Sequence, residues 1–532
     1  MTKNKDRQML KKCIDKNATD VFKDANCEHP LDQDIIRILK GLCDKITEDS
    51  DDYYIFRFRQ DTIDPLWKEL IEKAIKCLRY CDRREPFKEA EILGKKKVPK
   101  AYGINELKEY YDKYAEFERL LYGSNRYYRD HVVHVFRTWL SGTMLLVKNK
   151  GEYLDKLCLN EKDYEVRLSR VEKLSMWTMI ALTHDLGYPL QKAKSIIDTT
   201  RSMVSTFIAN PDISMDLSFH GVQNYMNDFI VRLMSSKMVK YKKVKTEENE
   251  EGKEVQLYAA RLQPKYYFKF QKSLENNSHG ILSTLIIYKL LTYFLESDYS
   301  INEDYAFDPE DQRQFYIRRE ILRAIASHTC NDIYQLYMTS FSFLLRICDD
   351  TQEWGRKNIS ELYVSQSQDY ELKDIDLYED ENNSYICTVE EEFTVSETLE
   401  VISLINRLRE QSLIYVTIFR DGQDTGTRNF SFVRKLSIKC GEVEVSLELK
   451  ILQDSASELT GMIKYNSDDS TKIAFGKEFY KKINIDWEKG VRFLTRNKSE
   501  CGVMRMEKDG EIKELANHSK WACGEFTIFL LK

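Results

Sequence analysis

The chain is poor in the residues that break helices. Its 532 residues include only 20 glycines and 8 prolines, which favours helices over a turn-rich all-β architecture. A chain of this length exceeds one ordinary hydrophobic core, so we expect two or three domains. The twelve cysteines form no C-x-x-C pair and no regular framework, which is typical of buried thiols in a reducing compartment. We therefore expect a mainly α protein with a cytoplasmic location.

Long apolar runs and an excess of positive charge are also missing. Lys289 interrupts the nearest candidate for a membrane span, Gly280 to Leu295, which is better interpreted as one buried helix. The N-terminus, Met1 to Arg7, lacks the apolar core of a signal peptide. The net charge of -6 gives no support for a dedicated duplex-binding protein. We expect no membrane partner and find no strong nucleic-acid signal.

Several common catalytic motifs are absent as well. The sequence has no G-x-x-x-x-G-K-[ST] phosphate loop, no G-x-S-x-G nucleophile elbow and no G-x-G-x-x-G fingerprint. These absences exclude the usual P-loop, α/β-hydrolase and dinucleotide-binding sites.

The hydrophobic pattern divides the chain into three segments. Residues 1–115 form an N-terminal helical extension, interpreted as a cap or an oligomerisation region, and a homo-oligomer is compatible with it. Residues 116–356 are strongly helical and contain six of the eight histidines. Within them, 236–256 is a block of lysines followed by glutamates, typical of a solvated loop or an exposed hairpin. In residues 369–532 the hydrophobic period changes from 3.6 to 2, which predicts a C-terminal α+β accessory domain.

The pattern of the C-terminal segment predicts individual elements. We expect a hairpin between 370 and 389, a strand over 413–419, and a second hairpin over 435–451 that turns at Gly441. The sequence Thr394-Val-Ser-Glu397 has the form of a capping box and predicts a helix running through about Ser412. Nothing in this segment has the pattern of a catalytic site.

The chemistry is concentrated where apolar helices end in histidine or aspartate. The helix over 177–183 runs directly into His184 and Asp185, then stops at Gly187 with Pro189 behind it. His279 opens an apolar helix, His328 ends another, and Asp349 follows the apolar run 341–347. Burying such groups costs free energy unless a partner of opposite charge compensates, and a metal ion does so. The pattern therefore predicts convergence of these side chains on a metal.

Another histidine pair lies on a single helix. His131 and His134 share one polar stripe with Asp130, Thr138 and Ser141. By spacing alone either His131 or His134 is a candidate ligand, and Asp350 competes with Asp349 at the other end of the site.

In this order, and in a helical setting, these residues resemble the HD-domain superfamily of metal-dependent phosphohydrolases. The similar segments are the following: 129–134, 183–189, 278–280, 327–329, and 344–349 leading into 352–356. The resemblance covers about 230 to 240 residues. It implies a helical HD-type domain over 116–356, with a nucleotide or related phosphoester as substrate. Tyr188 stands where the HD-GYP subgroup has a lysine, so cleavage of cyclic dinucleotides by that route is not expected.

The resemblance also implies roles for single residues. The implied ligands of one or two divalent transition ions (Mn, Fe, Co, Ni or Zn) are His134, His184, Asp185, His279, His328 and Asp349. Asp185 would bridge the two ions, and a metal-activated water would attack phosphorus. His131 would protonate the leaving oxygen, and Lys192 would contact phosphate. The alternatives are an HD-type di-iron oxygenase, which uses the same ligand order, and a non-catalytic sensor or assembly protein with a structural metal site.

Overall fold

The computed structural model describes most of the helical part of the chain and a sheet toward its C-terminus. The described residues are 2–14, 37–38, 40–41, 59–82, 101–124, 129–159, 166–209, 222–245, 254–296, 306–330, 337–356, 369–381, 385–396, 400–401, 404, 430–441, 443–452, 457–465, 492–494 and 523–530. The chain folds into two units. Unit 1 comprises Met1–Ser124, Asp130–Ile333 and Thr339–Asp349, and unit 2 comprises Asn125–Arg129, Tyr334–Met338 and Asp350–Lys532.

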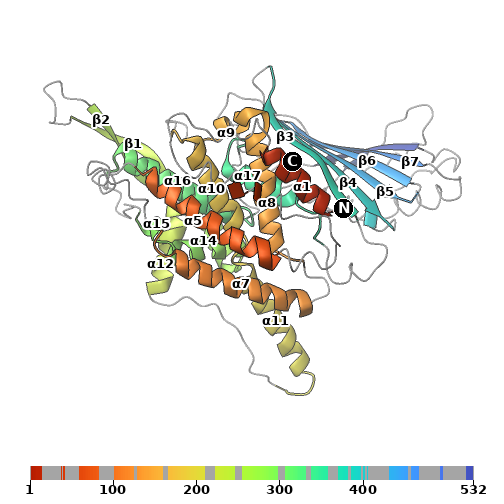
Figure 1. The fold of residues 1–532 in the computed structure, drawn as a ribbon, viewed down its shortest axis with the longest axis horizontal. Coiled ribbons are helices and arrows are strands. Elements are labelled where there is room, and N and C mark those ends of the chain that lie inside the picture. Colours follow the sequence, from red (N-terminus) through yellow and green to blue (C-terminus); the bar gives the residue numbers. More distant parts are fainter. Residues whose placement is uncertain are drawn as a thin grey trace. The chain divides into compact units, whose positions relative to one another are not determined.

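Helices make up most of unit 1 (Figure 1). They are α1 (Thr2–Ile14), η1 (Arg59–Ile63), α5 (Asp64–Tyr80), α7 (Ile104–Ser124), α8 (Val132–Val147), η2 (Lys148–Gly151), α9 (Glu152–Lys156), α10 (Arg170–Thr183), α11 (Tyr188–Val204), α12 (Val222–Ser235), α13 (Pro264–Glu275), α14 (His279–Leu290), α15 (Thr292–Leu295), α16 (Pro309–Ser327) and α17 (Phe341–Thr351), whose last two residues belong to unit 2. Among the residues that the structure describes, no helix is long and apolar enough to cross a membrane. The prediction of a mainly α chain with a C-terminal α+β part is confirmed.

Helices from the segment 1–115 pack on the helices that follow them. α1 lies against α8, and α5 lies against α10. The indole of Trp67 on α5 donates to the carbonyl oxygen of Leu182 at 2.7 Å, next to the end of α10. These helices belong to unit 1 with the rest of the helical region, and the predicted boundaries at 115 and 356 stay predictions.

Two tryptophans join α8 to α10. The indole of Trp177 donates to the carbonyl of Trp139 at 3.1 Å, and the indole of Trp139 donates to the hydroxyl of Thr178 at 3.1 Å. Gly142 makes this approach close, because a Cβ there would lie 2.0 Å from Cζ2 of Trp177. Both tryptophans are fully buried, so α8 and α10 form a fixed pair at the centre of unit 1.

The single helix predicted over residues 280–295 is wrong. α14 ends at Leu290, Leu291 is extended with φ -97° and ψ 114°, and the short α15 begins at Thr292. The reason is a close backbone approach. A Cβ on Gly103, where φ is +81°, would lie 1.8 Å from the carbonyl oxygen of Leu290, and the amide of Thr292 donates to the carbonyl of Tyr102. The amide of Thr292 therefore bonds the segment that precedes α7 instead of continuing the hydrogen bonds of α14.

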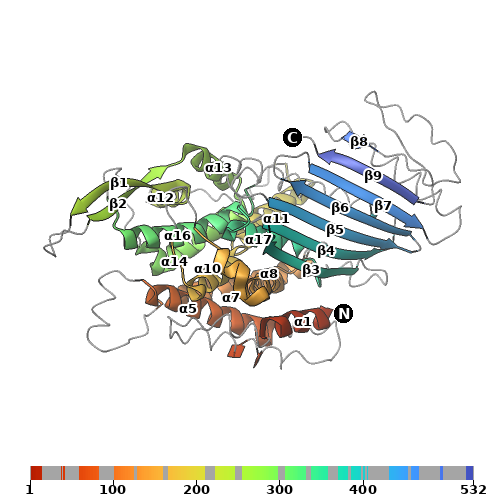
Figure 2. The same cartoon turned by 90° about the horizontal axis from the view of Figure 1, so that it is seen from above.

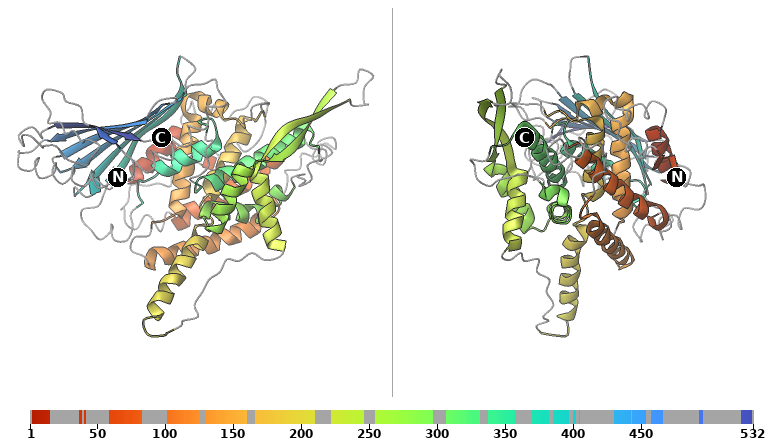
Figure 3. Two further views of the ribbon diagram at one scale, coloured as in Figure 1. Left: turned by 180° about the vertical axis from the view of Figure 1, so that it is seen from behind. Right: turned by 60° about the vertical axis from the view of Figure 1, so that its left-hand side comes forward.

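Two features of unit 1 extend away from its helices (Figure 3). The first is the antiparallel hairpin of β1 (Ser236–Lys245) and β2 (Glu254–Leu262), which confirms the exposed hairpin predicted for 236–256. The second is the C-terminal half of α11, where Met203 is 63 % exposed. The opposite end of α11 begins beside the histidine cluster described below.

In the part of unit 2 that the structure describes, seven strands form one sheet in the order β3-β4-β5-β6-β7-β9-β8 (Figure 2). Its strands are β3 (Asp369–Glu379), β4 (Tyr385–Val395), β5 (Phe430–Cys440), β6 (Val443–Leu452), β7 (Ser457–Tyr465), β8 (Arg492–Leu494) and β9 (Cys523–Leu530). Only the pairing of β4 with β5 is parallel among the described strands, and Tyr385 faces Phe430 there. Along β4 buried residues alternate with half-buried ones, and the second half of β3 follows the same pattern, as expected for a sheet whose two faces differ in burial.

Both hairpins predicted for this segment are confirmed. β3 pairs with β4, and β5 pairs with β6 across a turn at Gly441, where φ is +58°. The capping box at 394–397 is wrong, because Thr394 lies inside β4, opposite Lys439. Two residues later the amide and hydroxyl of Ser396 hydrogen-bond Glu400, which is helical. The strand predicted over 413–419 and most of the helix expected before it lie outside the described residues.

Candidate metal centre

Five helices of unit 1 bring six side chains to one place. His134 lies in the first turn of α8, where the carboxylate of Asp130 accepts from the amide of Val133 at 2.6 Å. The other five residues lie at or near helix ends: His184 and Asp185 follow α10, His279 begins α14, His328 follows α16, and Asp349 lies near the end of α17. Four of the six are less than 5 % exposed, namely His134, His184, Asp185 and His328.

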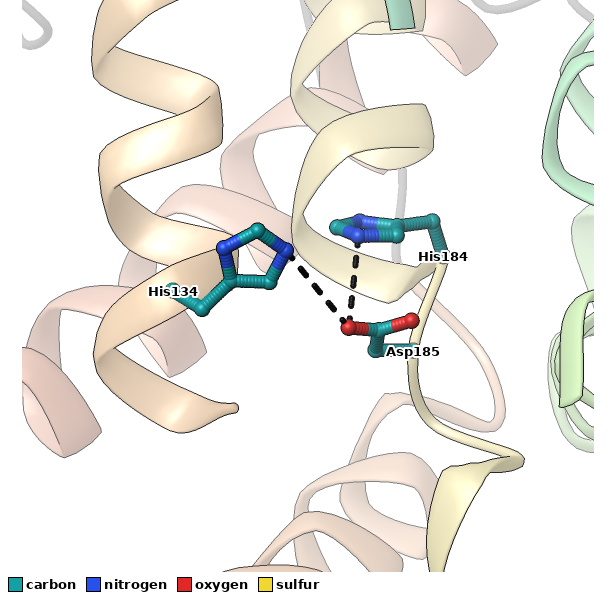
Figure 4. A group of neighbouring side chains, drawn as sticks. All are labelled: His134, His184 and Asp185. Atoms are coloured by element: carbon teal, nitrogen blue, oxygen red, sulfur yellow. Dashed lines mark ion pairs between the residues drawn. The ribbon is translucent and has the colours of Figure 1, made fainter. Parts of the chain in front are cut away.

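Asp185 lies between two pairs of histidines. Its Oδ2 is 3.4 Å from Nε2 of His184 and 3.8 Å from Nε2 of His134 (Figure 4). Its Oδ1 is 3.2 Å from Nε2 of His279 and 3.5 Å from Nε2 of His328. Each oxygen of one carboxylate therefore faces its own pair of imidazoles.

Asp349 completes the first of these two groups. Its Oδ1 lies 2.8 Å from Nε2 of His134 and 3.8 Å from Nε2 of His184. Its side chain is 21 % exposed and that of His279 is 20 % exposed, whereas the other ligand candidates are nearly closed to solvent. The cluster therefore opens on the side of Asp349 and His279.

The outer ring nitrogens of three histidines are held by oxygen acceptors. Nδ1 of His184 donates to the carbonyl of Ala181 at 2.8 Å, and Nδ1 of His328 donates to the carbonyl of Ile325 at 2.5 Å. Nδ1 of His279 lies 2.7 Å from Oε1 of Gln191. Because a carbonyl oxygen can only accept, each neutral ring carries its proton on Nδ1 and a lone pair on Nε2.

These lone pairs face other acceptors. Nε2 of His279 and Nε2 of His328 are 3.1 Å apart, and both face Oδ1 of Asp185. Nε2 of His184 is buried and makes no hydrogen bond within the described part of the chain. Acceptors placed this closely repel one another unless a positive charge lies between them. The Nε2 of His134 lies 2.8 Å from an oxygen of Asp349 and 3.8 Å from an oxygen of Asp185. Both distances are less than twice a metal–ligand bond of about 2.1 Å, so one ion could bind the nitrogen and either oxygen together.

The donor set fits a divalent transition ion. Within the ranges that the structure describes, three trios have ligand atoms within 4.8 Å of one another: His134 with His184 and Asp185, His184 with His328 and Asp349, and Asp185 with His279 and His328. Neutral imidazole nitrogens and carboxylate oxygens suit such ions, and hydrogen bonds on the outer nitrogens fix the rings as they do in metal sites. The cluster could therefore hold a metal ion.

Burial and neighbouring charges shift the pKa values of Asp185, Asp349 and His184. Burial alone would raise the pKa of Asp185, but His184, His279 and His328 hold it well below its usual value. The pKa of Asp349 is lowered in the same way by His134 and His184. Burial works against protonation of His184, yet the two carboxylates raise its pKa to about 9. Without a metal, a proton on His184 therefore supplies part of the missing positive charge.

Small residues let the helix ends approach. A Cβ on Gly187 would lie 2.4 Å from the carbonyl oxygen of His279, and a Cβ on Gly280 would lie 2.7 Å from the carbonyl oxygen of Ile325. The hydroxyl of Ser283 accepts from the amide of Gly187 and lies 2.7 Å from the carbonyl oxygen of His184, to which it can donate. Gly187 has φ -82° and precedes α11, so close packing rather than a left-handed helix end explains the glycine.

No known protein family, curated protein or solved structure matches this chain. The resemblance to the HD-domain superfamily therefore depends on the order of the histidines and aspartates in the sequence alone.

All six predicted ligands lie together, including Asp185, which was also predicted to be catalytic. The other two predicted catalytic residues, His131 and Lys192, lie beside them. His131 caps α8, and its ring is 6.3 Å from that of His134 between centroids. It belongs to none of the three ligand trios, so the geometry favours His134 as the ligand. Lys192 is half-buried on α11, with its ammonium 5.1 Å from the centroid of the Tyr188 ring. Asp350 belongs to no ligand trio, whereas Asp349 belongs to one.

Three residues contact the cluster or His131 in ways that the sequence did not predict. Gln191 contacts the ring and the amide of His279, and Tyr188 stacks on His131 with ring centroids 3.8 Å apart. Glu118 on α7 is fully buried, and its Oε2 accepts from the amide of His131 at 3.2 Å. The Nδ1 of the His131 ring lies 3.3 Å from the same oxygen. Gln191 and Tyr188 lie one turn or less into the helix that follows His184–Asp185, which is a signal that could have found them. Glu118 had no such signal, because it is distant in sequence from each motif.

Proposed function

We propose that this chain is an HD-type metal-dependent phosphohydrolase. It would act on a nucleotide or a related phosphoester, with one or two divalent transition ions at the cluster. The observation that carries the proposal is the position of Asp185, whose two oxygens face separate histidine pairs 3.2 to 3.8 Å away. A carboxylate placed in this way could bridge two ions, as a two-ion hydrolytic site would use it.

The two groups of ligands define two subsites. The first would use His134, His184, Asp349 and Oδ2 of Asp185, and the second would use His279, His328 and Oδ1 of Asp185. A shell that mixes imidazole and carboxylate suits Mn, Fe, Co, Ni or Zn better than Mg, which prefers oxygen ligands alone. When bound, such ions lower the pKa of a coordinated water and polarise a phosphoryl oxygen.

Residues beside the cluster would handle protons and phosphate. The Nδ1 of His131 faces Glu118, which leaves Nε2 as the atom that would carry a proton to the leaving oxygen. Lys192 lies next to Gln191 on α11, and its ammonium would contact a phosphate that enters from the open side. Gln191 would keep the ring of His279 oriented toward the second subsite.

Metal analysis combined with a nucleotide screen tests this function. Purified protein loaded with Mn²⁺ should retain metal after dialysis and release phosphate or pyrophosphate from at least one nucleotide. Asp185→Ala should lose both metal and turnover, because both subsites lose an oxygen ligand. Asp350→Asn is the matched control, since Asp350 follows Asp349 directly and belongs to no ligand trio.

Different outcomes would contradict different parts of the proposal. Wild-type protein that retains no transition metal would refute the metal centre. Metal binding with oxygen consumption, a visible absorption band and no phosphate release would favour the di-iron oxygenase instead. Metal binding without any turnover would favour a sensor or assembly protein.

A further inference from the structure

One face of α7 passes alongside the metal centre. Tyr110, Tyr114 and Glu118 recur every four residues, so they lie along one side of this helix. The hydroxyl of Tyr110 donates to the carbonyl of Leu186 at 2.9 Å, next to Asp185, and the carboxylate of Glu118 contacts His131. The eight residues from Tyr110 to Glu118 cover about 12 Å along the helix. Tyr114 therefore lies midway between the turn that carries Asp185 and the beginning of the helix that carries His134.

The hydroxyl of Tyr114 has no partner in the described part of the chain. The residue is 3 % exposed, and its oxygen is buried without a hydrogen bond. Burying a hydroxyl in this state costs stability, which phenylalanine would avoid at the same size. The neighbouring tyrosines on α7 are different, because Tyr110 donates to Leu186 and Tyr111 donates to Asp64 at 2.8 Å.

The carboxylates whose charges act on this hydroxyl are those of Glu118, Asp185 and Asp130. Burial and the negative charges of Glu118, Asp185 and Asp130 raise the pKa of Tyr114 well above its usual value, so the phenol keeps its proton. The inner groups of the cluster, which are carboxylate oxygens and histidine Nε2 atoms, would all be occupied by metal ions. An oxyanion bound to those ions needs donors for its remaining lone pairs, and a protonated phenol is such a donor.

We infer that Tyr114 is a substrate-binding residue whose hydroxyl donates a hydrogen bond to a phosphoryl oxygen of the substrate at the metal centre. This inference rests on the proposed function. It adds to it a contact from α7, a helix that lies outside every motif that suggested the family.

Orthophosphate is the probe, and Tyr114→Phe is the variant. The full chain is loaded with Mn²⁺, its metal content is measured, and phosphate binding is followed by calorimetry. Tyr114→Phe should retain the same metal and unfold at the same temperature as the wild type or higher. It should bind phosphate about tenfold to a hundredfold more weakly, the loss expected for a hydrogen bond to a charged group.

Tyr111→Phe is the matched control on the same helix. It removes a hydroxyl that donates to Asp64, so it should lower the unfolding temperature and leave phosphate affinity unchanged. A Tyr114→Phe variant that loses stability as Tyr111→Phe does would show that the hydroxyl has a protein partner, and the inference would be wrong.

The remaining outcomes separate this inference from the proposed function. If the wild type binds metal and phosphate, and Tyr114→Phe binds phosphate equally well, only the inference is refuted. If the wild type binds metal but no phosphate, both the phosphoester substrate and the contact from Tyr114 are refuted. Wild type that retains no metal refutes the metal centre and, with it, this role of Tyr114.

Discussion

Replacing Gly280 with alanine should separate His279 from His328. The new Cβ would lie 2.6 Å from Oγ1 of Thr329, 2.7 Å from the carbonyl oxygen of Ile325 and 3.0 Å from Cε1 of His328. The threonine hydroxyl can rotate away, but the carbonyl belongs to the backbone of α16. Ordinary contact begins at 3.4 Å, so α14 would have to retreat by the difference from 2.7 Å, about 0.7 Å. A metal site tolerates ligand displacements of only about 0.2 Å.

The sign of the change in the free energy of unfolding distinguishes two effects of the alanine. Helix propensity alone predicts that glycine to alanine inside a helix stabilises the protein by about 1 kcal/mol. Overpacking against a backbone carbonyl predicts a loss of about 1 to 3 kcal/mol. We expect the loss, measured by urea unfolding, together with a reduced metal content after loading with Mn²⁺ and dialysis.

Ile281→Val is the matched control for the Gly280 variant. Ile281 is the next residue and is fully buried, and its truncation should cost about 0.5 to 1.5 kcal/mol without displacing α14. The control should therefore lose stability but keep its metal. An alanine at 280 that raises stability and preserves metal content would refute the close approach of α14 and α16.

Two further predictions follow from the charged groups of unit 1. Because the folded-state pKa of His184 is raised from 6.5 to about 9, its contribution to the stability of the metal-free protein is complete below pH 6.5 and is lost as the pH rises through 9. Metal binding at pH 7.5 should accordingly release a proton from His184. Calorimetry in buffers of different ionisation heat measures this release, and finding none would contradict the prediction. Asp6 on α1 makes a bidentate pair with Arg137 on α8, both at most 2 % exposed, so Asp6→Ala should reduce the free energy of unfolding by about 3 to 5 kcal/mol. The double variant Asp6→Leu, Arg137→Met should recover much of that loss in urea unfolding; if it does not, the uncompensated guanidinium is not the cause.

The sequence predicted those parts of the site that depend on local pattern. His184, Asp185, His279, His328 and Asp349 each lie at or near the end of an apolar helix, and a buried charge there demands a partner wherever the helices go. The same reasoning identified the hairpins of the C-terminal sheet, since alternation with a turn at Gly441 is a local signal. The helix expected across 280–295 is interrupted at Leu291 by contacts with residues 102–103, which are distant in sequence.

Spacing could not decide between His131 and His134, since both lie on one polar stripe. Tertiary contacts separate them, because His134 faces Asp349 whereas His131 faces Glu118 from another helix. The role of Tyr114 could not be predicted from spacing either, because the sequence does not distinguish it from the other tyrosines of α7. Its missing hydrogen bond becomes visible only when the surrounding groups are in place.

Hydrogen bonds on the outside of the cluster favour a cation inside it. If the Nδ1 atoms of His184 and His328 faced solvent, each ring could turn its proton inward and satisfy a carboxylate without any metal. The carbonyls of Ala181 and Ile325 prevent this, since they can accept only a proton held on Nδ1. The rings of His184 and His328 can then balance Asp185 in two ways only, by becoming doubly protonated or by sharing a cation. Two adjacent imidazolium rings whose Nε2 atoms are 3.1 Å apart would repel each other, so a shared cation is the arrangement that satisfies His279 and His328 together.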